Sequence, residues 1–593
     1  MWRRNIVAIM TCLISLTSFA QSAEDMDRIM KLTGQDSPED LDEHEVERLS
    51  SYLQRPVRIN VASVSYLRSC GLFSPYQVAS LFDYRMRHGD VMSYVELASV
   101  DGFTDAAVQL LMPFISLEGG RVDAKGSGAF SYDGDLALRG GLKFSEYGMS
   151  GGYGLKYRGR ISNALTIAFS ASRSYDEKPD FPDLLSGHIM FEPTGRSFKF
   201  IAGDFNARFG QGLALWNGMS MTGLSKAASF FRSASGLSSS WSFTGSSAHT
   251  GVAGEYSFSR MRLSVLVSLP GIKNVGIRAC GILPAVNVGW YGRNMSMSLT
   301  HYLEYAHSIE HRKGYIPDMK TSADIAVCIK GTDVFSEFAL DWVSMTPAAL
   351  AGVRFPMGED LTMACHARYY PASFSSSRSA APRSVSKASN EYGISLCCEY
   401  MPDAGAFTGG MSADAAYLPV SKIDEGESLH LKVMADGEIR LSDSMVLKFR
   451  LSERFRTWGQ RFKTDLRSDL AWSGSRFSLV ARLNAVRCAG TGFLAYVEGG
   501  YKTEKFSIYL KQLFFLVDNW DDRIYSYERD APGNFSVPAF YGRGINTAIA
   551  LSWKFARWGK LYANGSMTSY PFMRGEKKKP GKAELEFQFV FSF

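Results

Sequence analysis

The last eleven residues of the chain, AELEFQFVFSF, alternate between apolar and polar side chains. Successive side chains of an extended strand point to opposite faces, so this segment would have one almost wholly apolar face. That face would carry Leu585, Phe587, Phe589, Phe591 and Phe593, and the other would carry Glu584, Glu586, Gln588 and Ser592. An edge strand with so many phenylalanines would promote aggregation in water, whereas lipid is a suitable solvent for it. The pattern predicts a membrane-spanning β-strand.

The same two-residue period recurs upstream, from about residue 128 to the C-terminus. It is clear at 545–555, 506–511 and 445–452, where polar and charged residues occupy the face opposite the apolar one. Hydrophobic residues make up 46% of the chain, yet its mean hydropathy is only −0.10, because each apolar residue has a polar neighbour. We therefore expect a mainly β protein in which residues 128–593 form a large antiparallel transmembrane β-barrel of about 24 to 26 strands. Side chains alone cannot fill so wide a lumen, so something must occupy it or pass through it.

The connections between the expected strands differ systematically in length. Counted back from the C-terminus, long connections at about 518–540, 418–428 and 371–390 fall on one side, and short ones near 474–476 and 442–444 fall on the other. Bacterial barrels have short turns in the periplasm and long loops outside. The pattern therefore predicts an outer-membrane protein whose C-terminus lies at the periplasmic rim.

The N-terminal residues 1–20 have the form of a secretory signal peptide. Arg3 and Arg4 precede an apolar run over 6–16, and Ser18-Phe19-Ala20 matches a small-x-small cleavage site. Beyond it, no run of about 18 apolar residues indicates a membrane-spanning helix. The eight cysteines are scattered, and one lies in the signal segment, so neither a disulfide framework nor a metal site is expected.

Two helical zones separate the signal from the barrel. Residues 21–56 are an acidic leader with a helical pattern, and residues 57–118 alternate helical patterns with glycine turns. We expect Asn60 to cap a helix that runs to Ser69, and Ser74-Pro75 to open another. Turns at Gly71 and Gly102 would then join helices as two hairpins.

This layout resembles the tandem helix-hairpin-helix domain of ComEA-type competence proteins. The resemblance lies in three motifs: INVAS at the entry, YRMRHG in the middle and VDGF at the second hairpin. The resemblance implies duplex DNA binding, because hairpin N–H groups of such domains contact phosphates. This chain departs from the pattern, with Phe73 and Thr104 where a second glycine is usual and with an acidic leader that would repel a polyanion. A structural or protein-docking role is the alternative. The candidate DNA-binding residues are Gly71, Gly102, Arg68, Arg85, Arg87 and His88.

Two further runs, GDFNARFGQGLALWNG at 203–218 and DNWDDRIYSYERDAPGNFSVPAFYGRG at 518–544, resemble those of Bacteroidetes outer-membrane proteins that join a helix-hairpin-helix domain to a large barrel. The resemblance implies the same two-part organisation over most of the mature chain. It implies no mechanism. The glycines of 203–212 have no helix pattern after them, so we interpret them as relieving crowding where strands bend, not as a phosphate loop.

Two of the predicted external loops have distinctive compositions. The loop at 518–540 combines carboxylates with aromatic residues, which suits a calcium ion or a sugar, although its spacing matches no calcium loop. The alternative is a folded loop that plugs or rims the barrel through salt bridges. Its candidate ligand residues are Asp518, Trp520, Asp521, Asp522, Glu528 and Asp530. The serine-rich stretch at 373–390 is predicted to be a mobile external loop.

No histidine cluster or catalytic constellation is apparent, so we expect no enzymatic activity, no cofactor and no metal. The leading hypothesis is an outer-membrane channel, translocator or scaffold. Its helical domain, in the periplasm, would dock a partner protein or close the lumen. The alternative is a DNA-uptake protein that captures duplex DNA through that domain. The expected partners are outer-membrane lipid and lipopolysaccharide, a periplasmic protein and, on the alternative, duplex DNA.

Overall fold

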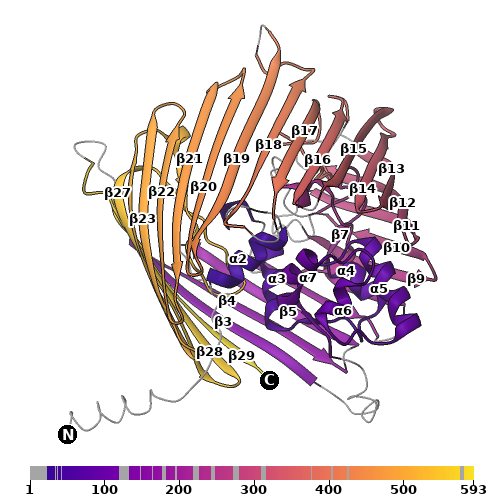
Figure 1. Ribbon diagram of the computed structural model, residues 1–593, viewed down its shortest axis with the longest axis horizontal. Coiled ribbons are helices and arrows are strands. Elements are labelled where there is room, and N and C mark those ends of the chain that lie inside the picture. Colours follow the sequence, from indigo (N-terminus) through magenta and orange to yellow (C-terminus); the bar gives the residue numbers. More distant parts are fainter. Residues whose placement is uncertain are drawn as a thin grey trace.

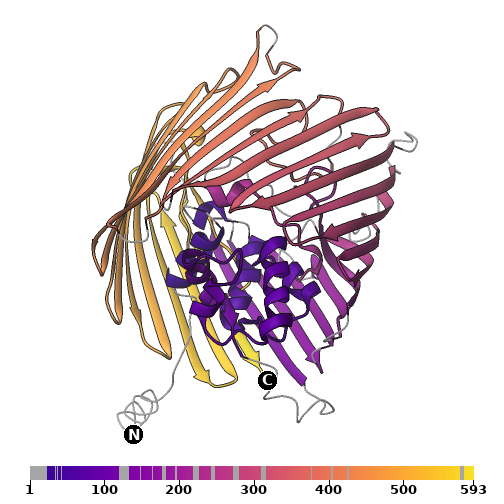
Figure 2. The ribbon, with the colours of Figure 1, turned by 45° about the vertical axis from the view of Figure 1, so that its right-hand side comes forward.

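The protein forms a closed β-barrel that surrounds a small helical domain (Figures 1 and 2). The computed structural model describes residues 23–33, 35, 38–41, 43–118, 132–146, 148–162, 164–176, 182–193, 197–217, 226–241, 248–270, 279–308, 316–358, 360–374, 377–402, 405–423, 426–573 and 580–593. The expected signal peptide at 1–20 lies outside these residues.

Within the described residues, 24 antiparallel strands close the barrel. The first five are β3 (Tyr132–Ser145), β4 (Gly148–Ile161), β5 (Leu165–Asp176), β6 (Leu184–Phe191) and β7 (Phe198–Arg208). The next eight are β9 (His249–Phe258), β10 (Met261–Ser268), β11 (Ala279–Tyr291), β12 (Met295–Ser308), β13 (Ile316–Ile329), β14 (Thr332–Asp341), β15 (Thr346–Met357) and β16 (Leu361–Tyr370). The last eleven are β17 (Glu391–Tyr400), β18 (Phe407–Leu418), β19 (Ser428–Ser442), β20 (Met445–Arg456), β21 (Phe462–Ser473), β22 (Phe477–Arg487), β23 (Thr491–Lys502), β24 (Phe506–Val517), β27 (Gly542–Ala556), β28 (Gly559–Ser569) and β29 (Lys582–Ser592).

The sheet closes where the last strand, β29, pairs with the first, β3. Phe589 lies opposite Leu138 in this pair, and the register continues without a shift from Ala583 to Ser592. A four-residue strand, β8 (Gly236–Ser239), pairs with the end of β7, which also pairs directly with β9. Closure gives each barrel strand two neighbours, so its backbone N–H and C=O groups find partners within the sheet.

The alternating pattern of the sequence separates the two surfaces of this barrel. In β29, Phe587 and Phe589 are 42% and 41% exposed on the outer wall, whereas Gln588 between them is 2% exposed. Gln588 donates a hydrogen bond to the carbonyl of Pro532, which belongs to the connection between β24 and β27. The apolar face therefore points outward and the polar face points into the lumen. This confirms the predicted fold class.

The long connections meet at one rim, because neighbouring antiparallel strands alternate in direction. The segments 371–390, 419–427, 518–541 and 570–581 all follow strands that run toward that rim. The opposite rim carries short turns and the C-terminal Phe593, whose backbone pairs with Gly134. This confirms the prediction that the long connections lie at one rim of the barrel and the short ones at the other. The assignment of the rims to the two sides of a membrane remains a prediction.

The helical domain comprises residues 23–118. Its elements are α2 (Ala23–Thr33), η1 (Pro38–Asp40), α3 (Glu43–Gln54), β1 (Val57–Arg58), α4 (Val64–Ser69), α5 (Pro75–His88), α6 (Tyr94–Ala98), α7 (Asp105–Leu111), η2 (Met112–Phe114) and β2 (Ile115–Ser116). Ser74 caps α5 in a reciprocal capping box with Gln77, and Thr104 caps α7. The predicted opening of α5 at Ser74-Pro75 is thus confirmed.

The prediction that Asn60 caps α4 is wrong. Ser63 does so, by accepting a hydrogen bond from the backbone N–H of Tyr66. Asn60 is buried instead, and its side-chain amide binds backbone groups of Val91 and Leu117. A short polar side chain next to a helix can cap it or join distant segments. Only the tertiary contacts distinguish the two roles.

One hydrophobic core holds the helical domain together. It includes Ile29 and Leu49 from the acidic leader and Leu67 and Phe114 from the region of the two hairpins, all 2% exposed or less. The leader and the hairpin region therefore fold as a single body. Two side chains from the connection at 518–541, Tyr527 and Phe535, also pack against this core.

The connection at 371–390, on the long-loop rim, turns back into the lumen. Phe374, Ala381 and Ala388 are almost fully buried, and Arg378 forms an ion pair with Glu304 on β12. The prediction of a mobile external loop at 373–390 is wrong for its described residues. Its serines serve as hydrogen-bonding groups, because the hydroxyls of Ser377 and Ser384 donate to the carboxylates of Asp318 and Asp414.

The glycines at 203–212 occur where the chain is crowded. Gly203 has a positive φ of 109°, and a Cβ atom there would lie 2.2 Å from the carbonyl oxygen of Gly187. Gly210 and Gly212 also have positive φ, in the segment that follows β7 into the lumen. Only glycine fits such positions without strain. This confirms the interpretation that these glycines relieve crowding.

Phe114→Ala should destabilise the helical domain by about 3–5 kcal/mol, because a fully buried aromatic ring leaves a cavity when it is removed. Met92→Ala removes a side chain that is 79% exposed and should change stability by less than about 0.5 kcal/mol. Hydrogen exchange measured by mass spectrometry would locate the loss of protection. Protection should fall across residues 23–118 and persist in the barrel strands. An equal loss in both variants would contradict the single-core description.

Candidate functional site in the barrel lumen

The helical domain is attached to the inner wall of the barrel mainly through charged side chains. Its acidic leader supplies most of the carboxylates, and the lumen-facing positions of the strands supply most of the cations. Five domain residues take part in these ion pairs: Asp27 with Lys448, Glu39 with Arg467 and Arg482, Glu47 with Lys156, Arg55 with Asp133 and Asp135, and Asp101 with Arg293.

The most buried of these contacts surrounds Glu39. Its Oε1 accepts a hydrogen bond from Arg482 Nη1 at 2.7 Å, and its Oε2 lies 3.3 Å from Arg467 Nη1. Both guanidinium groups also bind Asp469, and the Nε atoms approach its carboxylate at 2.6 and 2.7 Å. The backbone N–H of Tyr527 completes the Glu39 site at 2.9 Å. Two carboxylates thus balance two arginines in a place from which water is largely excluded.

Two further contacts show how the domain meets the wall. Asp27 lies 2.9 Å from Lys448, and its pKa is lowered because Lys448 and Lys31 together outweigh the effect of burial. The guanidinium of Arg68 stacks on the ring of Tyr291, 4.3 Å from its centroid. Burial, with a contribution from the charge of Arg262, lowers the pKa of Arg68 to about 10. Charged side chains therefore join the domain and the wall at several separate places.

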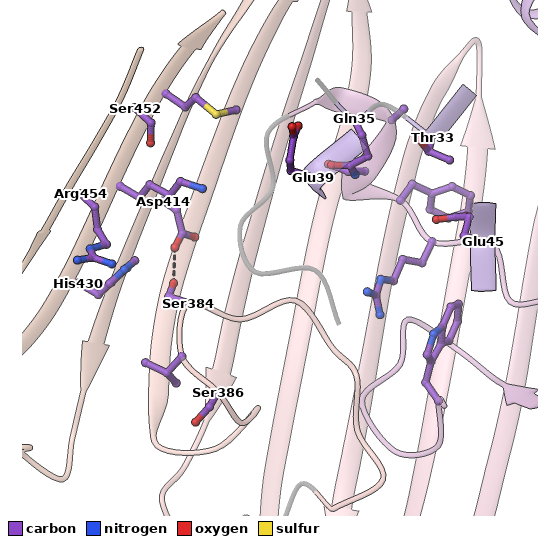
Figure 3. Close-up of a pocket in the computed structure, with 18 of the residues that line it drawn as sticks. Thr33, Gln35, Glu39, Glu45, Ser384, Ser386, Asp414, His430, Ser452 and Arg454 are labelled. Carbon is purple, nitrogen blue, oxygen red and sulfur yellow. Dashed lines mark hydrogen bonds between the residues drawn. The ribbon is translucent and has the colours of Figure 1, made fainter. Parts of the chain in front are cut away.

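A cavity of about 970 Å³ remains between the helical domain, the inward-turned connections and strands β18 to β21. Figure 3 shows Glu39 and Glu45 of the helical domain on one side and His430 and Arg454 of the strands on the other. We call this space the lumen cavity. Its charged lining residues are Glu39, Glu45, Arg48, Arg208, Arg232, Asp414, Lys422, Lys432, Arg450, Arg454, Arg456, Lys463 and Asp465.

The lumen cavity is strongly basic, since nine of its lining side chains are cationic and four are acidic. Three of the four acids already have cationic partners. Glu39 pairs with Arg467 and Arg482, neither of which lines the cavity, and Asp414 pairs with Arg368. Glu45 pairs with Arg48. Among the described residues that line the cavity, cationic side chains therefore outnumber acidic ones.

The residues proposed to bind DNA do not form one surface. Arg68 is buried against the barrel wall, and Arg85 donates hydrogen bonds to the carbonyls of Asn60 and Ala62 within its own domain. Arg87 is exposed and pairs with Asp83, and the ring of His88 lies against Tyr84. Each of these side chains thus contacts neighbouring residues of the domain or the adjacent barrel wall.

Each of the two hairpin glycines has a side chain close to it, although Gly102 is exposed and Gly71 only partly buried. Both have positive φ, as the predicted turns require. The guanidinium of Arg48 approaches Gly71, and the ring of Tyr76 approaches Gly102. A phosphate backbone that approached the turn at Gly71 would therefore meet the guanidinium of Arg48.

The acidic connection at 518–541 does not gather its carboxylates into one site. Asp518 pairs with Arg543 at the rim, and Trp520 packs edge-on against Tyr541. Asp522 is fully buried and accepts the N–H of Gly490. Asp521 lies with Trp520 and Asp522 in the short helix η4 (Trp520–Asp522).

Beyond η4 this connection enters the lumen. The short strands β25 (Ile524–Tyr525) and β26 (Ala539–Phe540) pair with each other at its base. Arg529, next to Glu528, pairs with Glu498 on β23. Asp530 accepts from the backbone N–H of Ala531 and from the amide of Asn564. The geometry favours the alternative stated for this loop, a folded segment that plugs the barrel through polar contacts.

Among the described residues, no group of three or more His, Cys, Asp or Glu side chains could hold a metal ion. No helix in the described part of the chain is long and apolar enough to cross a membrane.

The residues of the lumen site could be found only in part from the sequence. Lys448 and Arg450 were recognisable as charges on the face of β20 opposite the apolar one. Glu39 was visible only as one of many acids in the leader. No sequence signal joined it to Arg467 and Arg482, because more than 400 residues separate them.

No protein-family model matches the sequence, and no characterised protein is significantly similar to it. The resemblances to ComEA-type and Bacteroidetes proteins therefore remain predictions. The structure is similar to that of the siderophore receptor PirA from Pseudomonas aeruginosa, with 8% identity, 78% of this chain and 80% of that chain covered, and a TM-score of 0.41. It is also similar to the copper transporter OprC, with 8% identity, 77% and 80% covered, and a TM-score of 0.39. The translocation pore of the P pilus usher PapC matches with 9% identity, 78% and 99% covered, and a TM-score of 0.28. Identities and scores this low leave the chain's own geometry as the basis for assigning a function.

Glu39→Gln should weaken the attachment of the helical domain by about 3–5 kcal/mol, because it leaves two buried arginines with only Asp469 as a partner. Asp101→Asn breaks an exposed ion pair with Arg293 and should weaken the attachment far less than Glu39→Gln does. Protease digestion of residues 23–118 during a urea titration of the detergent-solubilised protein would measure both. If the two variants released the domain at the same urea concentration, the Glu39 site would not be its main attachment.

The packing of the 518–541 connection should depend on pH through Asp530. Burial, together with the charge of Glu586, raises the pKa of Asp530 from 3.8 to about 6. A raised pKa means that the folded state holds the proton more tightly than the unfolded state does. The contribution to stability is thus complete below pH about 4 and is lost as the pH rises through about 6.

Urea titrations between pH 4 and 7.5, followed by proteolysis within 518–541, would detect this loss. Asp530→Asn cannot titrate and should show a smaller fall in stability over the same range. The same pH dependence in both proteins would assign the effect to other groups.

Proposed function

We propose that this protein is an outer-membrane channel or translocator whose lumen is closed by its own helical domain and opens when that domain is displaced. The observation that carries the proposal is the nature of the contact between domain and barrel. The domain keeps its apolar residues in its own core and meets the wall mainly through ion pairs and polar groups. Such a body can leave the wall with little of its core exposed to water, chiefly the part against which Tyr527 and Phe535 pack.

A position in a membrane is supported by the outer wall of the barrel. Large apolar side chains such as Leu483, Leu466 and Phe493 are more than half exposed along successive strands. Water would be a poor solvent for a continuous apolar belt of this extent, and hydrocarbon is a good one. The long connections at one rim and short turns at the other fit a bacterial outer membrane.

The helical domain is placed toward the short-turn rim, which faces the periplasm in such barrels. Arg55 binds Asp133 and Asp135 near the start of β3, and Asp101 binds Arg293 in the turn between β11 and β12. On the same domain Met86, Met92 and Val95 are each more than 70% exposed. Exposed apolar residues suit a docking surface. A periplasmic protein that bound there could displace the domain.

Single-channel recording in a planar lipid bilayer tests the proposal. The wild type should remain mostly closed. The triple variant Asp27→Asn, Glu39→Gln, Glu47→Gln should show frequent large openings, because it removes three carboxylates that hold the domain and leaves their basic partners uncompensated. The matched control, Asp83→Asn, Asp105→Asn, Glu118→Gln, changes three carboxylates of the same domain that form no ion pair with a described barrel residue, and it should stay closed. A folded triple variant that conducts no more than the control would overturn the proposal.

A further inference from the structure

The connection at 518–541 reaches from the long-loop rim to the helical domain. Both of its ends are fixed at the rim. Asp522 accepts a hydrogen bond at 2.7 Å from the backbone N–H of Gly490, in the turn between β22 and β23. Ile524 and Phe540 pack in an apolar cluster with side chains of strands β22 to β24. One continuous segment therefore links this rim with the interior of the barrel.

The middle part of the connection, residues 526–536, is in direct contact with the helical domain. The backbone N–H of Tyr527 donates to Oε1 of Glu39 at 2.9 Å, and the same carboxylate binds two arginines of the strands. The rings of Tyr527 and Phe535, with centroids 5.5 Å apart, pack against the hydrophobic core of the domain. Separation would expose this apolar contact to water on both sides. The domain and the connection therefore stabilise each other inside the lumen.

Polar contacts hold the middle part of the connection against the barrel wall. The ammonium group of Lys511 on β24 donates to the hydroxyl of Ser526 and to the carbonyl of Tyr527, both at 2.7 Å. Arg529 pairs with Glu498 on β23 at 2.7 Å. Water can replace hydrogen bonds and ion pairs of this kind when the segment moves. The ends of the connection are thus fixed by apolar packing, whereas its middle part is attached by contacts that water can replace.

We propose that the connection at 518–541 is a latch for the helical domain, so that displacement of either one from its closed position releases the other. The coupling is reciprocal, because each stabilises the closed position of the other. A change at the long-loop rim, where Trp520 and Tyr525 are 53% and 45% exposed, is thereby transmitted to the domain on the opposite side of the barrel. This inference rests on the proposed function, since it states how displacement of the domain is controlled.

Trypsin digestion of the full-length protein in detergent during a urea titration tests the proposal, because mass spectrometry reports cleavage in the domain and in the connection separately. Tyr527→Ala combined with Phe535→Ala removes the two rings that contact the domain. Cleavage within residues 23–118 should then begin at a urea concentration about 1 M lower than in the wild type. The matched control, Tyr525→Ala, removes an exposed ring from the same connection and should leave this concentration unchanged.

The reciprocal experiment starts from the domain. Asp27→Asn combined with Glu47→Gln loosens the domain at Lys448 on β20 and Lys156 on β4. Cleavage after Arg529, in the middle part of the connection, should then also begin at a lower urea concentration, although neither substitution lies in the connection. The matched control, Asp105→Asn combined with Glu118→Gln, changes two exposed carboxylates of the same domain and should leave cleavage after Arg529 unchanged.

Retained migration of the folded barrel on an unheated gel would show that each variant is intact. Two results would each refute the latch: domain release that is unchanged in the Tyr527→Ala, Phe535→Ala variant, or cleavage after Arg529 that is unchanged in the Asp27→Asn, Glu47→Gln variant. The bilayer recordings are independent of these digestions. Coupled release in a protein that never conducts would remove the channel alone, and conductance without coupled release would remove the latch alone.

Discussion

Closure of the sheet is the constraint on which the rest of this structure depends. A strand with an apolar outer face can lie in hydrocarbon only if its backbone N–H and C=O groups are bonded to neighbouring strands. The pairing of β29 with β3 removes the last open edge. With 24 strands the ring is wide, and its inner face is polar because the outer face takes the apolar residues. A wide polar lumen then has to be filled by something that is itself polar on its surface.

The helical domain meets this requirement because its apolar residues lie inside and its charged residues lie on its surface. Its apolar side chains form one internal core, and its acids face the cations of the strands. Ion pairs of this kind are specific in position, yet their net contribution to stability is modest because both partners lose water. The domain is therefore placed accurately without being held by a large apolar interface. The connections at 371–390 and 518–541 add to the filling from the opposite rim, and they leave one basic space beside β18 to β21.

The parts of the fold that depend on local pattern could be predicted. The alternation in β29 separated Phe587 and Phe589 from Gln588, and the capping residue Ser74 marked the start of α5. Asn60 was misplaced because its hydrogen bonds reach residues 91 and 117, which no local pattern indicates. The serine-rich stretch at 373–390 was misplaced for a similar reason. Its composition is that of an exposed loop, but its serines and backbone groups find partners inside the barrel, such as Glu391.

The amino-acid sequence alone was enough to establish a large membrane barrel with a helical domain before it, because strand period, turn length and helix capping are properties of neighbouring residues. The pairing of Glu39 with Arg467 and Arg482, and the gathering of Lys432, Arg454 and Lys463 around one cavity, came only from the folded structure. Charges on a polar face have no preferred partner until closure of the sheet sets which strands face each other across the lumen. The residues of the site are therefore brought together by closure of the barrel. The barrel itself follows from the alternation of apolar and polar residues in its strands, which the sequence shows directly.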